Sequence, residues 1–174
     1  MVQISHNTWF IPTTYGSIIS SITKKHELIR IYLDNEATEV LCSKDPVDVL
    51  NQLQKNKIDI TSFSNYQEQC INEKRNCMKL AKANNWTLFS LYPLQLSVQT
   101  LNYCNARCDF CYANAPNASS RKTMDFSVIK KIKDYAALHG VKFGVSGGEP
   151  LLHPDIYKIL SYREDEVFDT LITN

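Results

Sequence analysis

Three cysteines lie within eight residues in the second half of the chain, in the segment CNARCDFC. They are Cys104, Cys108 and Cys111. Thiolates at spacings of four and three residues on a loop can all turn toward one compact metal centre. A cubane iron–sulfur cluster normally takes four cysteine ligands. Three ligands leave one iron with an open coordination position, where a metal can do chemistry.

Two other interpretations of this cluster remain open. A metal-free group of buried cysteines needs apolar surroundings, because a reduced cysteine packs like a small hydrophobic residue. The neighbours Asn105, Arg107 and Asp109 are polar instead. Structural zinc requires a fourth cysteine or histidine at suitable spacing. No second pair with zinc-finger spacing is found among the remaining candidates, Cys42, Cys70, Cys77, His139 and His153.

A second motif, Gly147-Gly148-Glu149-Pro150, follows the largely apolar run 141–145 after one intervening residue, Ser146. Glycine lets a backbone come close to a ligand or to another chain segment. Gly-Gly and Glu-Pro are also ordinary turn signals, so a plain turn is the alternative to a ligand-binding loop. His153 begins the sequence His-Pro-Asp, which is typical of a helix start and indicates a structural role.

The elements that must position these motifs alternate between strand and helix. We expect Asp125 to cap a helix that runs to about Leu138, with Gly140 after its end. One side of this helix should carry Val128, Ile132 and Tyr135. The other elements expected in this half are strands at 94–101, 141–145 and 167–172 and a helix that begins at Pro154.

Strands separated by helices predict parallel βαβ units with right-handed crossovers. Ligands of such sheets bind at the carboxyl ends of the strands. The loops 102–112 and 146–150 both follow predicted strands. We therefore expect both loops at the same edge of the sheet, where they can form one site.

The motifs together resemble the radical S-adenosylmethionine (radical SAM) superfamily. The signature of that family is Cys-x3-Cys-x2-Cys after a strand, with an aromatic residue, here Phe110, before the last cysteine. The segments 147–150 and 151–155 are similar to the family's next landmark. The third predicted strand ends on Ile172-Thr173-Asn174, which is similar to a strand end in the same superfamily.

The resemblance implies roles for these residues. Cys104, Cys108 and Cys111 would ligate three irons of a [4Fe–4S] cluster, and the amino and carboxylate groups of SAM would chelate the fourth. One electron would then cleave SAM to a 5′-deoxyadenosyl radical, which abstracts hydrogen from a substrate. Phe110 would lie near the adenine. The SAM-binding loop would be Gly147, Gly148, Glu149 and Pro150, with Glu149 accepting a hydrogen bond from the SAM amino group or holding the loop.

The resemblance also implies an α/β fold. Residues 92–174 would form the first three βα units of a partial (β/α)6 TIM-like barrel, after a small α+β domain at 1–91. Three units leave an open apolar strand edge. The chain is then a fragment, a truncated gene product or one that pairs with another chain, and the sequence does not separate these. An electron donor such as ferredoxin or flavodoxin is an implied partner.

In the first ninety residues, Leu28–Leu33 and Glu39–Cys42 predict two strands joined by a turn at Asp34-Asn35. A helix capped by Asp45 should follow from Pro46, with Val47, Leu50 and Leu53 on one face. A second helix should run from Ser64, in a capping box with Gln67, to Asn84-Asn85. One stripe of it should carry Tyr66, Cys70, Cys77 and Ala81.

Two strands followed by helices resemble the winged-helix modules of peptide-modifying enzymes. Such modules bind a precursor peptide as an added strand. An unrelated domain that packs on the barrel is the alternative.

The composition excludes several classes of protein. The 174 residues carry a formal net charge of +1, which does not favour a nucleic-acid partner or an anionic membrane. No secretory signal or transmembrane stretch is apparent, so we expect a cytoplasmic protein. The sequence thus predicts a radical SAM enzyme or its amino-terminal part. A non-catalytic iron–sulfur or leader-peptide-binding fragment is the alternative. A ferredoxin-type electron carrier is a third, weaker hypothesis.

Overall fold

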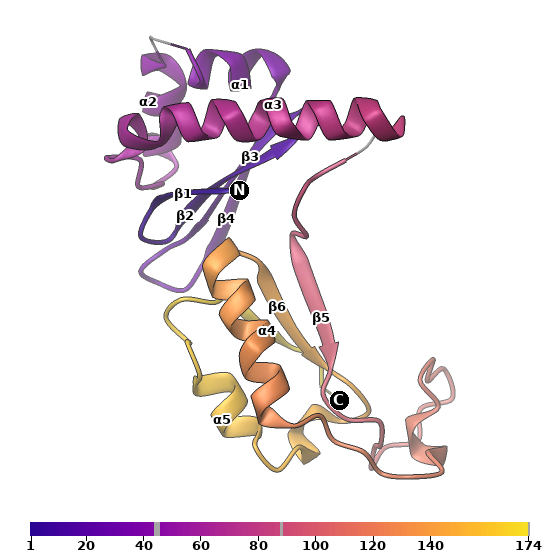
Figure 1. Cartoon of the computed structure of the whole chain (residues 1–174). Helices are drawn as coiled ribbons and strands as arrows, with labels where there is room; N and C mark the ends of the chain where they lie inside the picture. The colour runs from indigo at the N-terminus through magenta and orange to yellow at the C-terminus, as the bar shows by residue number, and fades with distance from the viewer. Residues whose placement is uncertain (44–45, 88, 174) are drawn as a thin grey trace. The chain divides into compact units, whose positions relative to one another are not determined.

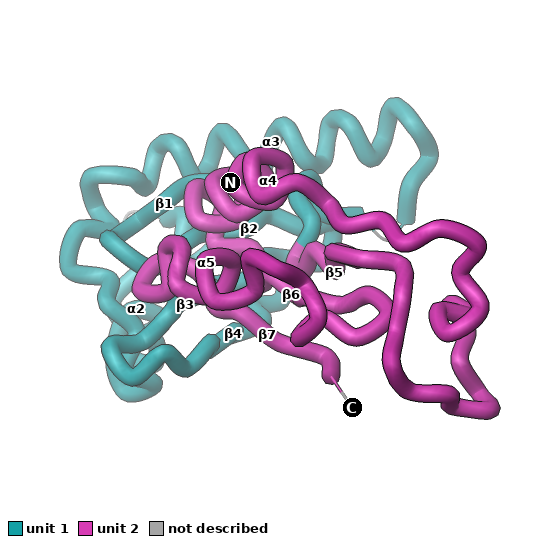
Figure 2. The backbone as a smooth tube through the Cα atoms, turned by 90° about the horizontal axis from the view of Figure 1, so that it is seen from below, with its two compact units in different colours: residues 1–93 teal, residues 94–174 magenta. Residues whose placement is uncertain are grey.

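The computed structural model describes residues 1–43, 46–87 and 89–173. The chain divides into two compact units, Met1–Pro93 and Leu94–Asn174 (Figure 2). Each unit has its own sheet and its own cluster of buried apolar side chains. Among the described residues, no helix is both long and apolar enough to cross a membrane.

The first unit is built on an antiparallel sheet with the strand order β1-β2-β3-β4. The predicted strand at 28–33 is confirmed as β4, whereas no strand was predicted for residues 2–22. Residues 8–21 carry several buried polar side chains, and these hide the alternation expected of a strand. Thr8 bonds Ser21 at 2.9 Å, and Ser17 bonds Thr38 at 2.9 Å. The strands are β1 (Val2–Ser5), β2 (Thr8–Thr13), β3 (Gly16–Ile22) and β4 (Leu28–Asp34).

The helices of this unit lie on one side of its sheet (Figure 1). They are α1 (Asn35–Leu41), α2 (Val47–Lys55), the 3-10 helix η1 (Phe63–Tyr66) and α3 (Gln67–Asn84). The predicted strand Glu39–Cys42 is wrong, because this segment is the end of α1 and its cap. Asp34 Oδ1 accepts the Ala37 N–H at 2.8 Å, so Asp34-Asn35 starts a helix rather than a hairpin.

The two later helices agree better with the sequence. The face expected of α2 is confirmed only in part, since Val49 and Leu53 are buried while Val47 is exposed. Its predicted cap, Asp45, lies outside the described residues. α3 begins at Gln67 rather than Ser64, because η1 occupies the preceding turn. Asn85 ends α3 in the left-handed conformation, at a φ of 54°. Of the expected stripe, Cys70, Cys77 and Ala81 are buried, whereas Tyr66 lies in η1 and is only partly buried.

The second unit is built on a parallel sheet, which confirms the expected pairing. Its strands are β5 (Gln95–Gln99), β6 (Lys142–Ser146) and β7 (Asp169–Leu171), in that order. Helices α4 (Phe126–His139) and α5 (Ile156–Ser161) connect them and cover one face of the sheet (Figure 1). Two short 3-10 helices complete the unit, η2 (Ala115–Asn117) and η3 (Pro150–Leu152).

Both predicted caps of α4 are confirmed, but its buried face is not. Asp125 Oδ1 accepts the Ser127 N–H at 2.7 Å, and Gly140 ends the helix at a φ of 56°. Val128 and Tyr135 are exposed and Ile132 is only partly buried against the core, whereas the buried side chains are Ile129, Lys133, Ala136 and Ala137. The sequence points to the wrong face because the true one contains a lysine. Lys133 Nζ is fully buried, 2.6 Å from Asp169 Oδ2 and 2.8 Å from the Ile159 carbonyl.

Candidate functional site

The loops that follow β5 and β6 are joined through their backbones. The Gly148 N–H donates to the Leu101 carbonyl at 3.1 Å, and the Glu149 N–H donates to the Tyr103 carbonyl at 3.1 Å. Tyr103 is the residue directly before Cys104. The expectation that these two loops share the carboxyl edge of the sheet is therefore confirmed.

The two glycines of the second loop are required by this contact. Gly147 has a φ of +145°, and a Cβ there would lie 2.5 Å from the Leu101 carbonyl oxygen. A Cβ on Gly148 would lie 1.9 Å from the Tyr103 carbonyl oxygen, which no side chain tolerates without a shift of the backbone. The close approach made by these glycines is thus toward the cysteine loop of the protein itself.

Glu149 is buried and holds its loop together. Its carboxylate oxygen Oε1 accepts the Leu151 N–H at 3.0 Å and the Thr173 hydroxyl at 2.6 Å. The side chain therefore closes the first turn of η3 and reaches the segment after β7. The hydroxyl of Thr173 is a contact that the sequence analysis missed. Its position after a predicted parallel strand, at the same sheet edge, was the available signal.

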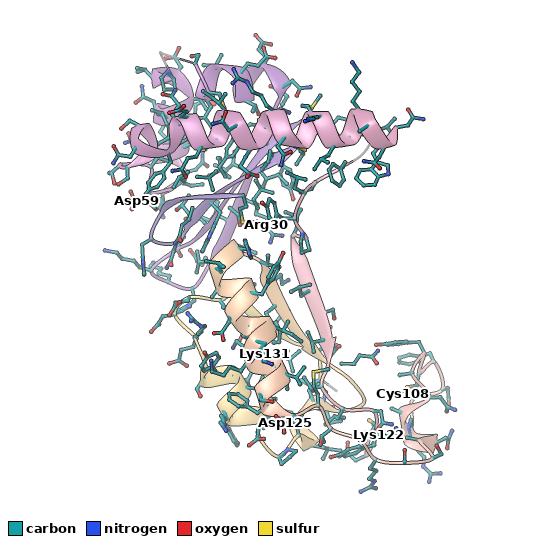
Figure 3. The ribbon with its side chains drawn as sticks, in the orientation of Figure 1. Arg30, Asp59, Cys108, Lys122, Asp125 and Lys131 are labelled. Carbon is teal, nitrogen blue, oxygen red and sulfur yellow. The ribbon has the colours of Figure 1, made fainter. Side chains whose placement is uncertain are left out.

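The three clustered cysteines are half-buried on one loop, which projects away from the sheet of this unit (Figure 3, Cys108). All six cysteines of the chain are described, and none forms a disulfide. The Cys104 sulfur accepts the Ala106 N–H at 3.3 Å, and the Cys111 N–H donates to the Cys108 carbonyl at 3.1 Å. In the described part of the chain, however, no three His, Cys, Asp or Glu side chains converge closely enough to hold a metal ion.

The donor set nevertheless suits an iron–sulfur cluster in its chemistry. Three thiols on one short loop, with a backbone N–H directed at one sulfur, are groups that such clusters use. Four-coordinate structural zinc needs one more ligand. His153, one of the candidates for a fourth ligand, is buried with both ring nitrogens engaged. Its Nδ1 accepts the Asp155 N–H at 3.1 Å, and its Nε2 donates to the Met124 carbonyl at 3.0 Å.

Two aromatic side chains of the cysteine loop face solvent. Phe110 is 90% exposed and Tyr112 is 81% exposed. The Tyr112 hydroxyl accepts a hydrogen bond from Gln99 Nε2 at 3.0 Å, which ties this part of the loop to the end of β5. Pro150, by contrast, is buried at the start of η3.

Comparison with known proteins matches residues 98–174 to the radical SAM superfamily model. A probable GTP 3′,8-cyclase of Methanococcus maripaludis is 39% identical over 64 residues, which are 36% of this chain and 22% of that protein. An uncharacterized protein of Methanocaldococcus jannaschii is 40% identical over 73 residues, 40% of this chain and 24% of that protein. The matched segments thus span less than a quarter of these relatives.

Solved structures of Streptococcus suis SuiB resemble the whole chain. SuiB bound to S-adenosylmethionine has a TM-score of 0.64 at 24% identity, over 99% of this chain and 42% of that chain. SuiB bound to the precursor peptide SuiA has a TM-score of 0.62 at 21% identity, over 100% of this chain and 43% of that chain. At these identities the likeness establishes the mixed α/β fold.

Proposed function

Because residues 98–174 match the radical SAM superfamily model, we propose that this chain is part of a radical SAM enzyme that uses a [4Fe–4S] cluster to cleave SAM reductively. Its second unit then supplies the first three βα units of a partial (β/α)6 barrel. The observation that carries this proposal is the hydrogen bond from the Glu149 N–H to the Tyr103 carbonyl. This bond brings the proposed SAM-binding loop next to the residue that precedes the first cysteine.

In this proposal Cys104, Cys108 and Cys111 would hold the cluster, and SAM would bind at the iron that they leave open. When bound and reduced, such a cluster would supply the electron for the reductive cleavage of SAM. A ferredoxin or flavodoxin is the proposed electron donor.

The tasks of the protein's own residues are binding and orientation. The Ala106 N–H donates to the Cys104 sulfur and so restrains the position of that side chain on its loop. Gly147, Gly148 and Glu149 keep the start of the cysteine loop in place through their backbone contacts. The exposed ring of Phe110 offers a flat apolar surface on which adenine can stack.

For the first unit we propose the binding of a precursor peptide as an added strand. The sheet order leaves β4 at an edge, and its side chains Ile29, Ile31 and Leu33 are only partly buried. An exposed edge with half-buried apolar side chains is the kind of surface that takes an extra strand. The likeness to SuiB, one of whose structures contains its precursor peptide, agrees with this proposal.

The test of the cluster is anaerobic reconstitution of the chain with iron and sulfide, followed by reduction with dithionite and electron paramagnetic resonance (EPR) with and without SAM. We expect a [4Fe–4S] signal that shifts when SAM is added. Alanine at Cys104, Cys108 or Cys111 should abolish the signal, whereas Cys42→Ala in the first unit should keep it. A signal indifferent to SAM would instead support a non-catalytic iron–sulfur fragment.

Peptide binding is tested separately by calorimetric titration of the chain with SuiA peptide. Binding that persists after all three clustered cysteines are replaced by alanine would assign the peptide site to a surface that needs no cluster. Loss of binding in that triple variant would place the peptide at the second unit and overturn the proposal for β4.

A further inference from the structure

The segments after the three parallel strands are linked by two hydrogen bonds in series. The Thr173 hydroxyl, after β7, donates to Glu149 Oε1 at 2.6 Å. The Glu149 N–H, after β6, donates to the Tyr103 carbonyl, after β5, at 3.1 Å. The next peptide bond leads from Tyr103 into Cys104. A displacement of Thr173 can therefore be transmitted through these two hydrogen bonds to the residue before Cys104.

The middle of this series has little room to move. The backbone at Gly148 lies so close to Tyr103 that even a Cβ would overlap the Tyr103 carbonyl. Two donors, Leu151 N–H and Thr173 Oγ1–H, bind the same carboxylate oxygen of Glu149. Two donors on one oxygen restrict the rotation of the carboxylate group. Since Glu149 is buried, water replaces a lost donor poorly.

We propose that Thr173 is a positioning residue for the cysteine loop and for the carboxylate of Glu149. It acts through Glu149 and touches neither iron nor SAM. The expected effect of Thr173 on SAM binding rests on the proposed function. Its effect on the position of the two loops does not, because the iron-free polypeptide already contains these contacts. Thr173 is an exposed residue, so its replacement leaves the apolar core of the second unit intact.

Hydrogen exchange of the iron-free chain tests the positioning. Thr173→Val keeps the shape of the side chain and removes the donor, and we expect it to speed exchange of the Glu149 amide by about tenfold. Thr173→Ser keeps the donor and should exchange like the wild type. Thr170→Val, on β7 itself, is the matched control. Unchanged exchange in Thr173→Val, or equal acceleration in Thr173→Ser, would overturn the proposal.

The reconstituted chain tests the consequence for SAM. Thr173→Val should assemble as much cluster as the wild type, but the SAM-induced change of its EPR signal should need about tenfold more SAM. Thr173→Ser should restore the wild-type SAM dependence. If the wild-type chain assembled no cluster, the proposed function would fail, while the exchange measurement on the iron-free chain would still decide the role of Thr173.

Discussion

The two sheets of this protein bring together different kinds of residues. In the first unit every strand pairs with its neighbour in sequence, so hairpins make the contacts. In the second unit β5 and β6 pair in parallel although a helix and the cysteine loop separate them in sequence. Parallel pairing gathers the loops after successive strands at one edge. The candidate chemistry therefore lies in the parallel unit.

The buried polar groups of the two units also differ in how far apart their partners lie in the sequence. The first unit buries hydroxyl pairs between neighbouring strands and helices, such as Thr8 with Ser21. The second buries an ion pair, Lys133 with Asp169, which joins α4 to β7. Burial raises the pKa of the Asp169 carboxyl, and the bond and charge of Lys133 oppose that rise. The parallel unit thus depends on a long-range charge contact.

The largest effect is expected from Lys133→Met, which leaves the Asp169 carboxylate buried without its partner. We expect a loss of about 3–5 kcal/mol in the free energy of unfolding of the second unit at neutral pH. The loss should shrink as the pH falls through the raised pKa of Asp169, because the protonated carboxyl needs no countercharge. Urea denaturation at several pH values, followed by hydrogen exchange in each unit, measures it.

Lys131→Met is the control for this change, since Lys131 is an exposed residue of the same helix (Figure 3). Both tryptophans, Trp9 and Trp86, lie in the first unit. Tryptophan fluorescence therefore follows the unfolding of the first unit alone, and hydrogen exchange is needed to follow the second unit, which contains Lys133. A Lys133→Met variant as stable as Lys131→Met would mean that the buried pair contributes no net stability.

A smaller loss is expected from Gly148→Ala, because the new Cβ would overlap the Tyr103 carbonyl. We expect about 2 kcal/mol, with faster hydrogen exchange in the loops after β5 and β6. Gly144→Ala in β6 is the matched control, since the nearest atom to its Cβ, Thr170 Oγ1, would lie at 3.4 Å. Equal effects of the two substitutions would show that the contact between the two loops does not require glycine at position 148.

The smallest effect is expected in the first unit, from Asp34→Ala. This change removes the cap that accepts the Ala37 N–H and should cost about 1 kcal/mol. Asp34→Asn keeps an acceptor and should cost less. A shift in the urea midpoint of tryptophan fluorescence measures the change. If hydrogen exchange in the second unit rose as much as in the first, the two units would unfold together rather than separately.

The secondary structure of the second unit was predicted from the sequence more accurately than that of the first unit. In the second unit, apolar runs and the caps of α4 are local signals, and they predicted all three strands and both principal helices to within a few residues. In the first unit, buried serine and threonine side chains hid β2 and β3, whereas β1 is only four residues long. A capping aspartate was interpreted as a hairpin turn, because Asp-Asn is compatible with either.

The sequence by itself determined the spacing of Cys104, Cys108 and Cys111, the Gly-Gly-Glu loop and the strand–helix alternation that sets both at one sheet edge. Only the tertiary structure showed that the two glycines contact the cysteine loop, that Thr173 reaches Glu149, and that Lys133 belongs to the core. Those three facts depend on which strands and helices are neighbours. Local residue preferences carry no information about such contacts between segments that are distant in sequence.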